Sequence, residues 1–86
     1  AWIGWQFHNP ETGGGTVQVF RREKAEDAAR TLPLSALAAE KKYRCWNTAH
    51  PEAATVLTGS ALLSPGLEIA LDAAPSAAVW RYEVTE

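Results

Sequence analysis

Hydrophobic and polar residues alternate with a period of two at the start of the chain. Within residues 2–8 the odd positions are all large and apolar, namely Ile3, Trp5 and Phe7. The even positions are mixed, namely Trp2, Gly4, Gln6 and His8. A period of two with aromatic and β-branched residues predicts a strand. We expect its uniformly apolar odd face to pack in the core and its even face to point outward.

A dense turn signal follows this strand. Residues 9–15 read Asn-Pro-Glu-Thr-Gly-Gly-Gly, and such residues start turns or accept a positive φ. Residues 16–22 then resume the alternation, with Val17 and Val19 facing inward. The pattern therefore predicts a β-hairpin. A phosphate-binding loop would also use consecutive glycines, but it needs a helix after them, whereas a strand follows here.

Five more strands are predicted in the remaining chain, at 31–34, 43–48, 54–58, 67–72 and 78–84. The first of them should lie at a sheet edge, because Pro33 has no backbone N–H to donate. The strands at 43–48 and 54–58 should pair as a second hairpin. Seven short strands at intervals of about ten residues are typical of a small antiparallel β-sandwich with Greek-key-like connections. At 86 residues the chain is long enough for one such domain, spanning positions 1–86.

The segments between these strands are expected to be irregular. Residues 23–30 have helix-forming composition but no apolar stripe, so we expect a solvated excursion. Residues 35–42 form a connector with one helical turn capped by Ser35. Residues 59–66 form a compact loop in which Leu62 and Leu63 plug the core.

Composition and charge argue against several classes of partner. The chain is 47% hydrophobic with a net charge of −2, which fits a folded domain and not a disordered one. Its one tight basic pair, at positions 21 and 22, is neutralised by Glu23, Glu26 and Asp27, so we expect no nucleic-acid partner. No apolar run reaches 18 residues, so we expect no membrane partner. A single cysteine, Cys45, is typical of the reducing cytoplasm.

Candidate catalytic residues are sparse. Glu68 and Asp72 share a strand face, but four residues of strand separate their Cα atoms by about 13 Å. Paired glycosidase carboxylates lie about 5 Å or about 6.5–9.5 Å apart. His8, His50 and Cys45 show no metal-ligand spacing, and a Cys45–His50 nucleophilic pair would lack an orienting third group. We therefore expect no catalytic, metal-binding or cofactor-binding residues in this chain.

The four tryptophans are the remaining candidates for a binding surface. Trp5 and Trp80 share faces with apolar residues and are expected in the core. Trp2 and Trp46 lie on the opposite faces of their strands and are expected to be exposed. Two exposed tryptophans on a small domain indicate that something covers them. A neighbouring domain of the same polypeptide, a stacked sugar and a partner protein all remain open.

Two stretches resemble a known family. GWQFHNPETGGGTVQVFRR resembles the first hairpin of the C-terminal domain of glycoside hydrolase family 36 α-galactosidases. LTGSALLSPGLEIALDAAPSAAVWRYE is similar to the closing segment of that domain. The resemblance implies an antiparallel sandwich that follows a (β/α)₈ catalytic barrel. In such enzymes two Asp residues on the barrel carry a retaining mechanism, so the resemblance places no catalytic residue in this chain.

The resemblance also implies a partner, the catalytic barrel of the same polypeptide. Absence of any Met residue agrees with this, because it indicates a piece of a longer chain. We therefore predict a non-catalytic accessory domain of an α-galactosidase-like glycosidase. Residues 43–50 depart from the family pattern, so a related barrel glycosidase fits equally well. An autonomous carbohydrate-binding module and an immunoglobulin-like interaction domain are the alternatives.

Overall fold

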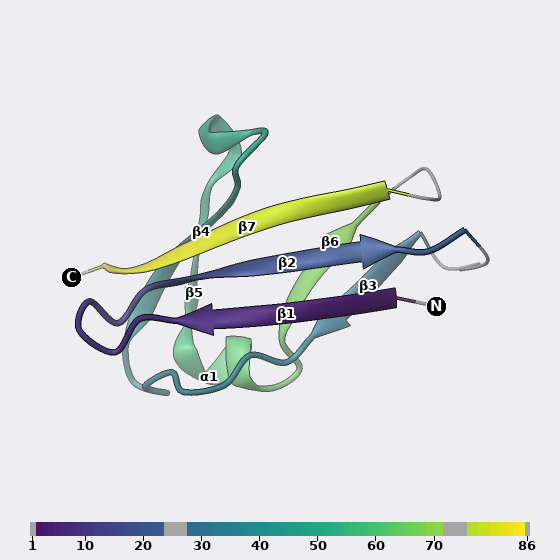
Figure 1. Cartoon of the computed structure of the whole chain (residues 1–86). Coiled ribbons are helices and arrows are strands. Elements are labelled where there is room, and N and C mark those ends of the chain that lie inside the picture. The colour runs from purple at the N-terminus through teal and green to yellow at the C-terminus, as the bar shows by residue number, and fades with distance from the viewer. Residues whose placement is uncertain (1, 24–27, 72–75, 86) are drawn as a thin grey trace.

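The computed structural model describes residues 2–23, 28–71 and 76–85 (Figure 1). Its strands are β1 (Trp2–His8), β2 (Gly15–Arg21), β3 (Ala29–Leu32), β4 (Lys42–Asn47), β5 (Thr55–Thr58), β6 (Leu67–Ala70) and β7 (Ser76–Thr85). A 3₁₀ turn, η1 (Pro51–Ala53), and a short helix, α1 (Gly59–Leu63), complete the elements. The prediction of a small all-β domain with antiparallel sheets is therefore confirmed.

The strands form two sheets in which every pairing is antiparallel. The larger sheet has the order β1-β2-β7-β4-β5, and β3 pairs with β6 in the smaller one. Both predicted hairpins are present, as β1–β2 and β4–β5. The last strand, β7, lies between them and joins them into one sheet. In Figure 1, β3, β6 and α1 lie behind β1 and β2, and together they form the second layer.

The core lies between these two layers. Its buried members from the large sheet are Val17, Val19, Tyr43, Cys45 and Tyr82. Its members from the second layer are Leu34, Leu37, Leu62, Leu67 and Ile69. Leu62 is fully buried, and Leu63 packs against the cluster from its margin, so the predicted plug is present. Most of the predicted loop that carries it is helical, as α1. Two strands, one helix and a connector cover the inner face of the five-stranded sheet, and no element of the described residues covers its outer face.

The loop of the first hairpin closes through its own backbone. Asn9 N donates to Gly14 O, and Gly13 N donates to Asn9 O, each at 2.8 Å. The Asn9 side chain accepts a further bond of 3.0 Å from Glu11 N. Gly13 has a φ of 78°, a conformation that favours glycine. The turn chemistry read from the sequence therefore produces the predicted hairpin.

The helical turn expected at residues 35–42 is wrong. Ala36 has a φ of 64°, which a right-handed helix cannot contain. Ser35 caps no helix; its N–H donates to Gln6 Oε1 at 2.8 Å and ties the connector to β1. The third strand also begins at Ala29, earlier than predicted. Three predicted surface carboxylates, Glu26, Asp27 and Asp72, lie outside the described residues.

The predicted facing of β1 is also wrong. Trp5 is 50% exposed, whereas Trp2 is half-buried and packs against the core cluster. Gly4 explains the inversion, because a Cβ at this position would lie only 3.3 Å from Leu32 Cδ1. The end of β3 passes under β1 there, and a face that admits it needs a small residue. The glycine-bearing even face therefore points inward, and the odd aromatic face points to solvent.

Candidate functional site

The outer face of the five-stranded sheet gathers most of the large exposed hydrophobic residues in the described part of the chain. Trp5, Phe7, Phe20 and Val79 all lie on it, with exposed fractions between 37% and 57%. Strand register places Ile3 beside Phe20 and Phe20 beside Ala77. We call Ile3, Trp5, Phe20, Ala77 and Val79 the aromatic patch. Apolar patches of this kind on small soluble domains mark interaction surfaces.

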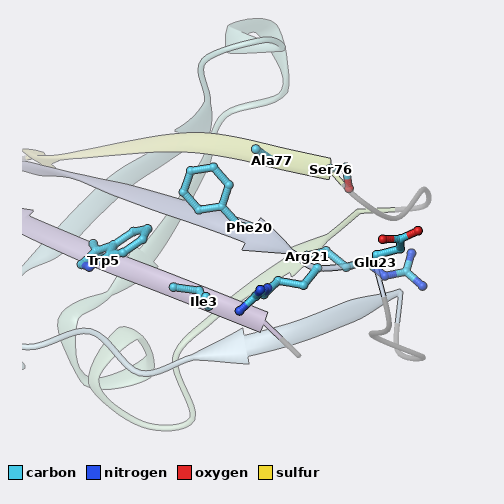
Figure 2. Close-up of a pocket in the computed structure, with 8 residues that line it drawn as sticks. Ile3, Trp5, Phe20, Arg21, Glu23, Ser76 and Ala77 are labelled. Atoms are coloured by element: carbon cyan, nitrogen blue, oxygen red, sulfur yellow. The ribbon is translucent and has the colours of Figure 1, made fainter.

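The two rings of the aromatic patch pack against each other. Their centroids are 5.6 Å apart and their planes are inclined by 81°, an edge-to-face pair. Figure 2 shows Trp5 and Phe20 turned toward each other above β1 and β2. Beside them lies an open hollow of about 620 Å³ with a mostly apolar lining. The charged residues of its described lining lie at one end, where β2 ends at Arg21 and is followed by Arg22 and Glu23.

The other end of the same face is polar. Strand register places four side chains in one row across β1, β2, β7 and β4, namely Phe7, Thr16, Arg81 and Trp46. The Arg44 guanidinium lies 4.8 Å from the centroid of the Trp46 ring and 3.7 Å from Glu83 Oε1. A hollow of about 460 Å³ opens above this row and reaches the loop of the first hairpin. This end therefore combines aromatic walls with charged and hydroxyl groups.

The two tryptophans predicted to form a binding surface do not lie together. Trp46 is on the outer face of the large sheet, as predicted, and it is half-buried under Arg44. Trp2 is on the inner face and packs against the core, so the predicted exposure of Trp2 is wrong. Trp80 also packs against the core, as predicted.

Two functional candidates, Trp5 and Phe7, were predicted on the core face of their strand, whereas the outward position of Phe20 agrees with the predicted inward facing of Val17 and Val19. Alternation separates the two faces of a strand but does not say which of them is buried. The useful signal was Gly4 on the even face, together with the absence of any small residue on the odd face. A strand that must be crossed closely by another segment carries its glycine on the crossed side.

A hydrogen-bonded network fixes β1, and therefore Trp5, to the rest of the domain. Gln6 Nε2 donates to Ser35 O and to Tyr82 Oη, both at 2.8 Å. Because Tyr82 Oη accepts from Gln6, its own proton is available for His8 Nδ1, which lies 2.8 Å away. The phenol is buried, and burial raises the pKa of Tyr82 above its ordinary value. The network holds the edge strand in place from its inner face.

The other residues considered for chemistry are dispersed. Cys45 lies in the core, and burial raises the pKa of its thiol to about 11, which keeps it protonated at neutral pH. His50 is exposed in the loop after β4, 3.7 Å from Glu52 Oε2. Glu68 is exposed on β6. Within residues 2–23, 28–71 and 76–85, no group of three or more His, Cys, Asp or Glu residues is arranged to hold a metal ion.

No protein-family model matches the chain, and a search of curated proteins finds no match. The helices in the described part of the chain are all too short to span a bilayer. The outer sheet face, with its exposed aromatic residues, is the strongest indication of a binding surface.

Proposed function

We propose that this chain is a non-catalytic accessory domain of an α-galactosidase-like glycosidase. Its aromatic patch would pack against the (β/α)₈ barrel of the same polypeptide and stabilise it. The observation that carries the proposal is the exposure of Trp5 and Phe20, at 50% and 41%, on the sheet face that no other described element covers.

Burial energy supports a macromolecular cover for this surface. Large side chains gain about 1.5–3 kcal/mol each when they are moved from water into an apolar contact. A complementary surface that buried the patch would therefore gain several kcal/mol of binding free energy from Ile3, Trp5, Phe20 and Val79. Interfaces between domains of one chain bury about 600–1,500 Å².

The geometry of the patch favours a protein surface over a stacked sugar. Sugar rings stack on flat aromatic surfaces, whereas the Trp5 and Phe20 planes are inclined by 81° and offer no continuous plane. The hollow beside them, about 620 Å³, suits an inserted apolar side chain from a neighbouring domain. An immunoglobulin-like interaction domain would use the same surface on a separate protein.

Substitutions in the longer polypeptide test the proposal. Trp5→Ser and Phe20→Ser should lower the melting temperature of the catalytic unit while leaving its active site intact. Gln18→Ser replaces a polar residue of the same face, on β2 directly opposite Trp5, and is the control that should have little effect. Unchanged melting temperatures for both aromatic variants would contradict the proposal. Hydrolysis of an aryl α-galactoside by the pure 86-residue chain would contradict its non-catalytic part.

A further inference from the structure

The polar end of the outer sheet face carries a second inference, which does not depend on the aromatic patch. We propose that the hollow above the row Phe7, Thr16, Arg81 and Trp46 binds a saccharide of one or two rings that carries a carboxylate group. The walls are aromatic, the floor is a hydroxyl and a guanidinium, and the volume is about 460 Å³.

The walls and floor follow from strand register. Phe7 stands on the edge strand β1, and Trp46 stands three strands away on β4. With about 4.8 Å between neighbouring strands, their Cα atoms lie about 14 Å apart. Thr16 and Arg81 occupy the two strands between them. One or two pyranose rings fit across this distance, with their C–H faces toward the aromatic walls and their hydroxyls toward the floor.

Arg81 supplies the charge that selects the ligand. It is exposed, and its guanidinium makes no ion pair or hydrogen bond with any residue that the structure describes. Arg44, the other cation at this end, already pairs with Glu83 at 3.7 Å and covers one side of the Trp46 ring. The free guanidinium of Arg81 can therefore bind one carboxylate group of a ligand through two parallel hydrogen bonds.

The same charge count argues against a phosphorylated ligand. A phosphate carries a larger charge and is usually held by several donors, often the backbone N–H groups of a glycine loop. Here four backbone N–H groups of that loop are already used. Asn9 and Gly13 bond within the backbone, Glu11 donates to Asn9 Oδ1, and Gly14 donates to Thr12 Oγ1 at 3.2 Å. Among the described residues that line the hollow, Arg81 is the one permanently charged donor, and Glu83 is the one carboxylate and already pairs with Arg44.

The position of the hollow argues against an extended peptide. A peptide that adds a strand needs an unpaired sheet edge. The floor here is formed by β2 and β7, which both have partners on each side. Because the backbone of the floor is already paired, recognition has to come from side chains. A compact ligand with many hydroxyl groups suits this surface, which stays open to water.

Nuclear magnetic resonance of the ¹⁵N-labelled 86-residue chain tests the inference. The four tryptophans give four indole N–H signals, and Trp46→Phe identifies the one that belongs to the hollow. Digalacturonate should move the Trp46 signal saturably with millimolar affinity, and the Trp80 signal should stay in place and report an intact fold. Neutral galactobiose, benzoate and inorganic phosphate should each bind at least about ten-fold more weakly.

Matched variants complete the test. Arg81→Ala and Phe7→Ala should each weaken digalacturonate at least about ten-fold, and both side chains are exposed, so the fold should persist. Arg22→Ala, an exposed arginine at the other end of β2, should leave the affinity unchanged. The inference is overturned if the Trp46 signal does not move, if Arg81→Ala binds as well as the unchanged chain, or if phosphate or benzoate binds as tightly as digalacturonate.

Discussion

The side-chain amide of Gln6 donates a hydrogen bond of 2.8 Å to the buried phenol of Tyr82, across the inner face of the large sheet. This bond joins the edge strand β1 to the central strand β7, although β2 lies between them. Gln6 also exchanges hydrogen bonds with the Ser35 backbone, so one side chain links β1, β7 and the connector of the second layer. These bonds help to hold the even face of β1, which carries Gln6, toward the interior.

Removing this amide should destabilise the domain. Gln6→Ala deletes four hydrogen bonds, three with Ser35 and one with Tyr82, and it leaves the Tyr82 phenol with fewer partners. We expect the free energy of unfolding in urea to fall by about 1–3 kcal/mol. Gln18→Ala, on the outer face of β2, should change it by less than about 0.5 kcal/mol. Equal effects of the two substitutions would show that the network does not hold β1.

Truncation of the two tryptophans on β1 should lower stability by different amounts. Trp2 packs against the core, so Trp2→Ala should lower the free energy of unfolding by about 2–4 kcal/mol. Trp5 contacts Phe20 on an open face, so Trp5→Ala should lower it by about 1 kcal/mol or less. Urea unfolding of both variants measures the difference. A larger loss for Trp5→Ala would mean that β1 faces the other way.

Two glycines make a similar comparison. A Cβ on Gly15 would meet the carbonyl oxygen of Phe7 and would lie 2.5 Å from Tyr82 Oη, both rigidly held. A Cβ on Gly4 would lie 3.3 Å from the end of the Leu32 side chain, which can move. Gly15→Ala should therefore lower the free energy of unfolding by about 3 kcal/mol or more, and Gly4→Ala should lower it by about 1 kcal/mol. The thermal midpoint should fall much further for Gly15→Ala. Similar midpoints for the two variants would contradict the register of β1, β2 and β7.

The secondary structure could be read largely from the sequence, whereas the facing of β1 could not. Period-two alternation and the turn residues at 9–15 are local signals, and the first hairpin depends on little else. The facing of β1 depends on Leu32, which lies 28 positions from Gly4 in the chain. The place of β7 between β2 and β4 is also a long-range property, because β7 pairs with strands at both ends of the chain.

The candidate site was missed for the same reason. Trp46 was placed correctly because its neighbours on β4, Tyr43 and Cys45, define a clear inner face. On β1 the odd face is the more hydrophobic one, so hydrophobicity predicts the wrong orientation. The correct orientation follows from the steric requirement at Gly4, and Leu32, which imposes that requirement, belongs to another strand.

Alkaline pH should weaken the fold through Cys45. Burial raises the pKa of its thiol from 9.0 to about 11, so from pH 9 upward the unfolded chain loses a proton that the folded chain keeps. Stability is therefore constant below this window and falls as the pH rises through it, by about 1.4 kcal/mol per pH unit. Tyr82, whose pKa is also raised by burial, should steepen the fall above pH 10.

Urea unfolding of the chain and of Cys45→Ala over this pH range checks the effect. The variant should be less stable at neutral pH, because it leaves a small cavity in the core, but it should lack the slope that begins at pH 9. Parallel pH profiles for the two proteins would show that the thiol is not protected by burial.

Hydroxyl-radical footprinting of Trp5 tests the docking proposal most directly. Oxidation of Trp5 and Phe20 is measured by mass spectrometry in the 86-residue chain and in the longer polypeptide, with His50 as an exposed control. We predict rapid oxidation of both aromatic residues in the isolated chain, strong protection of both in the longer polypeptide, and no change at His50. Equal oxidation of Trp5 in the two proteins would contradict the proposal that this face packs on a neighbouring domain.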